Sequence, residues 1–123
     1  DVRWLGVVAN EALPAVLCRY RYFVLASLWE GMPKALLEAM SAGLVCIGND
    51  TTGINEVIKD GITGYLSPSA SRDDIAETIR RAQAGDSERV VSAATQFIRS
   101  TFSLDAVIAQ EREVFAAICP KIR

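Results

Sequence analysis

The feature that most constrains the fold is a pair of short apolar runs, each followed by a polar loop and a helix-forming segment. These runs are "YFVLASL" at residues 22–28 and "LVCIG" at residues 44–48. Apolar runs of this length, without polar alternation, are typical of strands buried on both faces of a parallel sheet. Their alternation with helical segments predicts β-α-β units and therefore an α/β fold with a Rossmann-like parallel sheet.

Glycine and proline positions predict where the other elements begin and end. Pro33 suits the first turn of a helix, and Gly43 suits the position after its end. The segments "NDTTG" and "DGITG" are typical of loops and turns. We expect strands at 2–6, 22–28, 44–48 and 65–67, and helices at 13–20, 33–42 and 54–59.

Three further helices are predicted after residue 67. Ser71 and Asp74 resemble a capping box at the start of the first, and Gly85 ends it. The second places Val90, Val91, Ala94, Phe97 and Ile98 inward, and the third, starting near Ser103, buries Val107, Ile108, Val114, Phe115 and Ile118. We expect these helices to pack on the sheet, so that residues 1–123 form one partial domain.

Composition excludes several classes of protein. Half of the 123 residues are hydrophobic and the net charge is −2, which argues against a broad nucleic-acid surface. The chain has no histidine, so it offers no imidazole base or ligand. Cys18, Cys46 and Cys119 are widely spaced, which indicates free thiols and a cytoplasmic protein, with Cys46 the least reactive.

The junction between strand 22–28 and helix 33–42 is a candidate binding site. Ligands of parallel α/β sheets bind outside the carboxyl ends of the strands, where Glu30 and Gly31 are expected. The first amides of a helix suit a phosphate, while a carboxylate accepts hydrogen bonds from hydroxyl groups. A sugar phosphate offers both features.

Glu38 has a simpler interpretation as well. Lys34, Glu38 and Ser41 lie on one face of the predicted helix, so Glu38 can be a solvated residue weakly paired with Lys34. Periodicity alone favours this interpretation, and for Glu30 a favourable contact with the helix dipole is a similar alternative.

The segment "SLWEGMPKALLEAMSAG" at residues 27–43 resembles the donor-site motif of retaining GT-B glycosyltransferases, written E-x7-E. Glu30 and Glu38 match its two acids. The resemblance continues in "VRWLG", in Leu13-Pro14 and in "GINEVIKDGITGYL", and it covers roughly residues 1 to 84. It implies a partial carboxyl-terminal domain of a GT-B enzyme.

The resemblance also implies roles for individual residues. Glu30, the catalytic candidate, would bind hydroxyls of the donor sugar, and Glu38 would bind the ribose of a nucleotide-diphosphate sugar. The amides around Gly31, Met32, Pro33 and Lys34 would face the diphosphate. Thr52 and Gly53 are candidate nucleotide contacts, although an ordinary turn explains them equally well. The implied reaction transfers a sugar to an acceptor hydroxyl with retention, in polysaccharide or glycolipid synthesis, without a cofactor or metal.

The same resemblance implies that this chain is part of a longer protein. The amino-terminal acceptor domain and the basic residues that grip the phosphates would lie upstream of Asp1, so we expect the fragment alone to be inactive. In the Rossmann order 3-2-1-4-5-6, segments 2–6 and 22–28 would be strands 3 and 4. Strands 1 and 2 are missing, so we expect the fold to leave a gap, to rearrange, or to borrow strands from a neighbour. An oligomer through the unpaired sheet edge is the form that such borrowing would take.

Peripheral membrane association of the parent is a further hypothesis, and no nucleic-acid partner is expected. The alternative function is a non-catalytic α/β module that binds a nucleotide or a protein partner.

Overall fold

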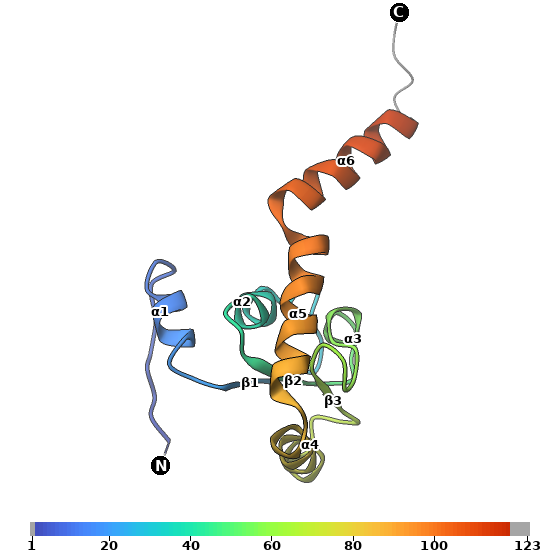
Figure 1. The fold of residues 1–123 in the computed structure, drawn as a ribbon. Coiled ribbons are helices and arrows are strands. Elements are labelled where there is room, and N and C mark those ends of the chain that lie inside the picture. The colour runs from blue at the N-terminus through green and yellow to red at the C-terminus, as the bar shows by residue number, and fades with distance from the viewer. Residues whose placement is uncertain (1, 119–123) are drawn as a thin grey trace, which may run out of the picture.

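The computed structural model describes residues 2–118. Its three strands form one parallel sheet in the order β1-β2-β3, as Figure 1 shows. The elements in chain order are α1 (Leu13–Leu17), β1 (Tyr22–Leu25), α2 (Lys34–Ser41), β2 (Val45–Asn49), α3 (Ile54–Val57), β3 (Tyr65–Ser67), α4 (Arg72–Ala84), α5 (Ser87–Phe102) and α6 (Leu104–Ile118). The predicted parallel α/β arrangement is confirmed.

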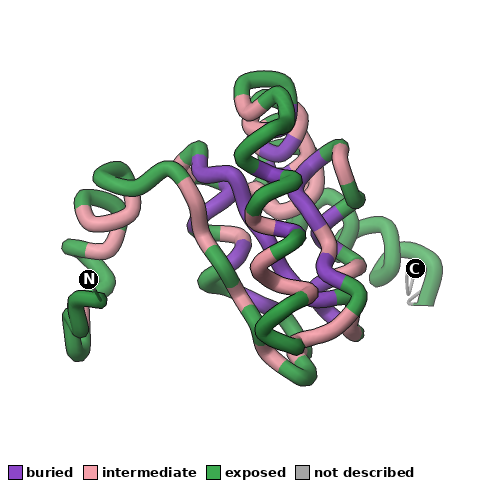
Figure 2. Tube along the Cα trace, turned by 90° about the horizontal axis from the view of Figure 1, so that it is seen from below, coloured by how far each residue is buried: buried purple, intermediate pink, exposed green. Residues whose placement is uncertain are grey.

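The core lies on both faces of β2, all of whose residues are buried. Successive side chains of a strand point to opposite faces, so Cys46 joins one apolar cluster while Val45 and Ile47 join another. The first cluster includes Leu36 of α2, and the second includes residues of β3, α4 and α5. Figure 2 shows this buried interior in purple. The apolar run at 44–48 is therefore explained by burial from two sides.

The helix boundaries follow the predicted signals closely. Pro33 directly precedes α2, and Gly43, just past its end, has φ +83, which a residue with a Cβ adopts at a cost. Ser71 caps α4 by accepting a hydrogen bond from the amide of Asp74 at 3.2 Å. Asp86 caps α5 in the same way through the amide of Arg89, at 3.0 Å.

The prediction of a strand at residues 2–6 is wrong. These residues form no strand, and the side chains of Val2 and Trp4 are 101% and 92% exposed. Backbone groups of a strand need a neighbouring strand as partner, and no strand of residues 2–118 lies beside this segment.

Three other elements are shorter than predicted. Strand β1 stops at Leu25 because residues 26–31 turn away toward the loop that follows β2. Helix α1 stops at Leu17. Helix α3 stops at Val57 because the chain becomes extended at Ile58. The amide of Lys59 then donates a hydrogen bond to the hydroxyl of Thr63 at 2.8 Å.

The burial predicted for α6 is also wrong. The five residues predicted to be buried are exposed, from 39% at Val107 to 70% at Ile118. The backbone of Ser103 is extended, with φ −64 and ψ 153, so the chain changes direction there. Figure 1 shows α6 leaving the body of the molecule beyond α5, so only α4 and α5 of the closing helices cover the sheet.

Candidate functional site at the carboxyl ends of β1 and β2

Two loops meet at the carboxyl ends of the adjacent strands β1 and β2. The hydroxyl of Thr51 donates a hydrogen bond to the carbonyl of Leu28 at 2.9 Å. The amide of Glu30 donates to the carbonyl of Thr52 at 3.3 Å. Both bonds join residues distant in sequence, so the loop that carries Glu30 is tied to the loop after β2.

Gly53 is the point of closest approach between these loops. Its φ of +83 lies in the left-handed region. A Cβ at this position would collide with the carbonyl oxygen of Glu30 and would lie 3.0 Å from that of Gly31. Glycine is therefore required here for two independent reasons, backbone conformation and space. Four of the predicted site residues, namely Glu30, Gly31, Thr52 and Gly53, are brought together by this contact.

The start of α2 has fewer backbone N–H groups free to bind a ligand than the sequence suggested. Pro33 has no N–H, and the amide of Lys34 already donates to the carbonyl of Met32 at 2.8 Å. Within residues 2–118, the amides of Gly31 and Met32 donate to no other group. Of the four predicted positions, these two leave an N–H for a ligand. The side chains of Met32 and Lys34 are exposed and that of Pro33 is buried.

Glu38 lies apart from this junction, on the exposed side of α2. It borders a hollow of about 400 Å³ between α1, α2 and the end of α5. Leu13, Leu17 and Phe102 contribute apolar walls, while Glu38 and Ser41 contribute polar groups. The pair with Lys34 does not form, since neither residue takes part in an ion pair within the described chain.

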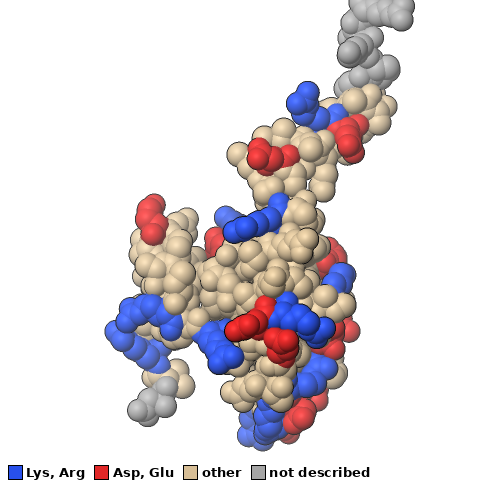
Figure 3. Space-filling model, in the orientation of Figure 1, with Lys and Arg blue, Asp and Glu red and all other residues tan. Residues whose placement is uncertain are grey.

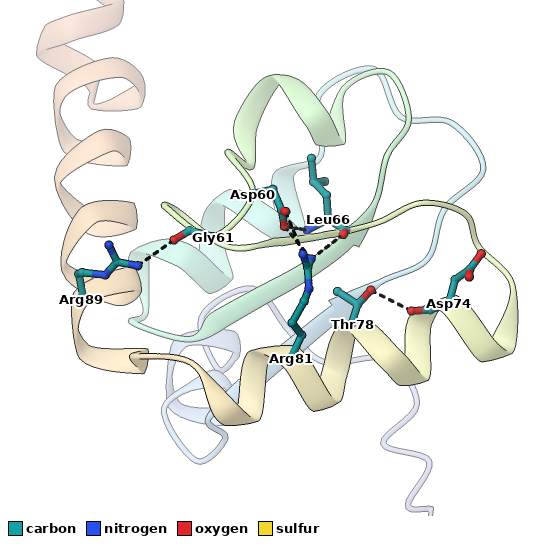
Figure 4. Close-up of polar contacts among 7 residues, drawn as sticks. All are labelled: Asp60, Gly61, Leu66, Asp74, Thr78, Arg81 and Arg89. Atoms are coloured by element: carbon teal, nitrogen blue, oxygen red, sulfur yellow. Dashed lines mark hydrogen bonds and ion pairs between the residues drawn. The ribbon is translucent and has the colours of Figure 1, made fainter.

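A second polar cluster, which the sequence did not indicate, lies at β3. The carboxylate of Asp60 accepts hydrogen bonds from the guanidinium of Arg81 at 2.8 and 3.1 Å and from the amide of Leu66 at 2.8 Å (Figure 4). Burial acts to raise the pKa of Asp60, but the hydrogen bonds from Arg81 and Leu66 outweigh it and hold the pKa below its usual value. This cluster fixes the "DGITG" turn against α4.

Two other kinds of functional element are absent from residues 2–118, namely a metal-binding cluster and a membrane-spanning helix. Residues 2–118 contain no group of three or more histidine, cysteine, aspartate or glutamate side chains arranged to hold a metal. Within the same residues, no helix combines the length and apolarity needed to cross a bilayer. On the face shown in Figure 3, acidic and basic side chains are interspersed.

Comparison with known proteins identifies the family. The sequence profile described as "Glycosyl transferases group 1" matches residues 1–84, which is most of the chain. The chain therefore belongs to the group 1 glycosyltransferase family.

Curated relatives support this assignment. The chain is 29% identical over 121 residues to the amylovoran biosynthesis glycosyltransferase AmsK of Erwinia amylovora, covering 92% of this chain and 30% of the relative. It is 48% identical over 54 residues to the UDP-Gal:alpha-D-GlcNAc-diphosphoundecaprenol alpha-1,3-galactosyltransferase of Escherichia coli, covering 44% of this chain and 14% of the relative. The chain thus spans less than a third of either relative.

The fold is shared with solved structures. Anabaena Alr3699/HepE, crystallised with UDP and glucose, superposes with a TM-score of 0.80 at 19% identity, over 94% of this chain and 32% of HepE. The prediction of a partial carboxyl-terminal domain of a GT-B glycosyltransferase is confirmed as a fold assignment. These matches do not favour the alternative of a non-catalytic module.

Proposed function

We propose that this chain forms the donor half of a glycosyltransferase site, which transfers a sugar from a nucleotide-diphosphate sugar to an acceptor hydroxyl with retention of configuration. The observation that carries the proposal is the contact between the two loops, which holds Glu30 beside the amides of Gly31 and Met32. The relatives support it: HepE was crystallised with UDP and glucose, and the names of the other two refer to UDP-Gal and to amylovoran synthesis. Synthesis of a polysaccharide or glycolipid is the corresponding process.

In this proposal Glu30 binds hydroxyl groups of the transferred sugar. A carboxylate accepts hydrogen bonds from neutral hydroxyls, and such charge-assisted bonds are stronger than neutral ones. The amides of Gly31 and Met32 face the diphosphate, where negative charge grows as the sugar leaves. These groups position the donor and stabilise the leaving group, and the mechanism we propose requires no metal.

Glu38 binds the nucleoside end of the donor. The apolar walls of its hollow suit a base, while the carboxylate accepts hydrogen bonds from the ribose hydroxyls. The side chain lies more than one turn along α2 from Gly31, so the ribose is further from the reacting bond than the sugar is. Thr52 and Gly53 support the loop between these two subsites.

The acceptor domain belongs, in this proposal, to the longer parent protein. The isolated chain therefore binds a donor weakly and does not transfer sugar. The parent associates with the membrane peripherally, because a lipid-linked acceptor would be found there. Within residues 2–118, Cys18 and Cys46 are free thiols, and we propose on this basis that the protein works in the reducing cytoplasm.

The experiment replaces Glu30 and Glu38 separately by glutamine in the parent protein. Each lost charge-assisted hydrogen bond should cost about 1.5–3 kcal/mol, which is roughly ten- to a hundredfold in the affected step. Glu38→Gln should weaken binding of both the nucleotide sugar and the bare nucleotide diphosphate in calorimetry. Glu30→Gln should leave the bare nucleotide affinity nearly unchanged and lower kcat/KM for transfer.

Glu88→Gln is the matched control, because Glu88 is exposed on α5 and lies beside Arg21 and Gly43, at the opposite end of the strands from both loops. It should behave like the parent in both measurements. If both Glu30→Gln and Glu38→Gln also bind and turn over like the parent, the assignment of this site is wrong. Addition of EDTA tests the metal-free mechanism, which would be contradicted by loss of transfer that Mg²⁺ restores.

A further inference from the structure

The loop after β2 is fixed from two sides. The amide of Asp50 donates a hydrogen bond to the carbonyl of Ser67 in β3 at 2.7 Å. The carboxylate of Asp50 accepts one from the side-chain amide of Asn55 in α3 at 2.8 Å. The carbonyl of the next residue, Thr51, accepts a hydrogen bond from the backbone amide of Asn55 at 3.0 Å. These bonds hold Thr51 in place relative to both β3 and α3.

The segment that carries Glu30, residues 26–31, lies between β1 and α2 and belongs to neither. Within the part of the chain that the structure describes, two hydrogen bonds join this segment to the rest of the molecule. The first, from the hydroxyl of Thr51 to the carbonyl of Leu28, is 2.9 Å long. The second, from the amide of Glu30 to the carbonyl of Thr52, is 3.3 Å long. The position of the segment therefore depends on the loop after β2.

The shorter of these bonds depends on a side chain. Thr52 contributes a backbone carbonyl, which every residue has, whereas Thr51 contributes a hydroxyl, which most residue types lack. We propose that Thr51 is a positioning residue for the transfer reaction, because its hydroxyl holds the carbonyl of Leu28 and thereby sets the place of the Glu30 carboxylate. This inference rests on the proposed function and adds a residue to the same donor site.

The expected effect of Thr51 is on transfer and not on nucleotide binding. In the proposed site Glu30 binds the sugar that is transferred, and a group that is already in place when the donor binds needs no reorganisation during the reaction. A small displacement of such a group slows the reaction. Glu38, which binds the nucleoside end, lies on α2 and takes part in neither of the two bonds. Loss of the Thr51 hydroxyl should therefore lower the rate of transfer while the bare nucleotide still binds.

The first test replaces Thr51 by valine in the parent protein, which keeps the β-branched shape and removes the hydroxyl. Thr51→Val should lower kcat/KM for transfer about fivefold. It should change the calorimetric affinity for the bare nucleotide diphosphate by less than about twofold. Thr51→Ser keeps a hydroxyl and should restore kcat/KM. The donor used is the nucleotide sugar that most stabilises the parent in a thermal-shift screen of UDP-, GDP- and ADP-sugars.

A double variant tests whether Thr51 acts through Glu30. If it does, the variant that carries both Thr51→Val and Glu30→Gln should have the kcat/KM of Glu30→Gln alone, within about twofold. Effects that multiply in the double variant would overturn the inference. Thr78→Val is the matched control, because the hydroxyl of Thr78 also donates to a backbone carbonyl, that of Asp74 at 2.8 Å, but within α4. This control should leave kcat/KM unchanged.

Hydrogen exchange tests the geometry without a donor. The amide of Glu30 is paired across the same contact between the loops, so Thr51→Val should speed its exchange at least about threefold, whereas Thr78→Val should not. If Glu30→Gln has no effect on transfer, the proposed function fails and the inference falls with it. If Glu30→Gln lowers transfer but Thr51→Val changes neither transfer nor exchange, the inference is overturned and the proposed function stands.

Discussion

At the residue scale, the contact between Gly53 and the backbone of Glu30 is the most demanding feature of the site. Gly53→Ala should cost roughly 1–2 kcal/mol for the left-handed backbone, and about 1–3 kcal/mol more for the overlap with the carbonyl of Glu30. Urea unfolding followed by circular dichroism measures this loss.

Gly61→Ala is the comparison, since Gly61 has φ +69 but a Cβ there would meet nothing within 4 Å. Gly61→Ala should therefore lose only the free energy of unfolding that the left-handed backbone costs, roughly 1–2 kcal/mol. If the two alanine variants unfold at the same urea concentration, the close contact between the loops at Gly53 is not real.

The thiols of Cys18 and Cys46 should differ in reactivity. Burial raises the pKa of Cys46 to about 12, because the thiolate is disfavoured in an apolar core. At pH 8 its thiolate fraction is on the order of 10⁻⁴, so Cys46 should resist alkylation while the exposed Cys18 reacts. Peptide mass spectrometry after timed labelling separates the two sites. Early labelling of Cys46 in the native protein would contradict its burial. The third cysteine, Cys119, lies outside the described residues.

At the element scale, Asp60 links β3 to α4 and should make stability depend on pH. Its folded-state pKa is below the ordinary value, so its contribution is present above about pH 4 and is lost as the pH falls through the folded pKa. The ion pair with Arg81 is partly exposed, which limits its contribution to about 1 kcal/mol.

Comparison with Asp60→Asn isolates this contribution. The difference in unfolding free energy between the two proteins should be present at pH 7 and should shrink as the pH falls below about 4, the ordinary pKa of an aspartate. Asp73→Asn is the control, because Asp73 pairs with Arg72 on the open surface. A difference that is constant over this pH range would show that Asp60 is not responsible.

Individual strands and helices differ in how far the sequence predicts them. Strand β2 and helix α2 were found because their apolar residues and bounding glycines act locally. Residues 2–6 have the composition of a strand, yet a strand also requires a neighbour, which composition does not supply. The apolar stripe of α6 correctly indicates a helix, but a stripe does not say which surface it meets. The bond between Asp60 and Arg81 spans 21 positions, and no local pattern signals it.

The sequence predicted some features of the candidate site and missed others. The position of Glu30 followed from the end of a strand in a parallel sheet. Its contact with Gly53 was not predicted, because that contact depends on how the loops after two adjacent strands fold toward each other. The loss of the Lys34 amide to the carbonyl of Met32 depends on the backbone path of a single turn. The hollow beside Glu38 depends on where α1 and α5 pack, which is a tertiary property.

At the scale of the whole molecule, the chain consists of a core with two exposed ends. Residues 2–12 and helix α6 contribute no buried residue, whereas α4 and α5 cover the sheet (Figure 2). Limited trypsin digestion should therefore cut first after Arg3 and Arg112, at least about tenfold faster than after Arg80 or Arg99. Mass spectrometry of timed samples gives the order. Cleavage within α4 at the same rate would contradict this division.

The two hydrogen bonds between the loops at the carboxyl ends of β1 and β2 have a mechanical consequence. Because the Thr51 hydroxyl donates to the carbonyl of Leu28 and the Glu30 amide donates to the carbonyl of Thr52, neither loop can shift without breaking a bond to the other. The two loops therefore move as one rigid unit, and a displacement in one is transmitted to the backbone of the other.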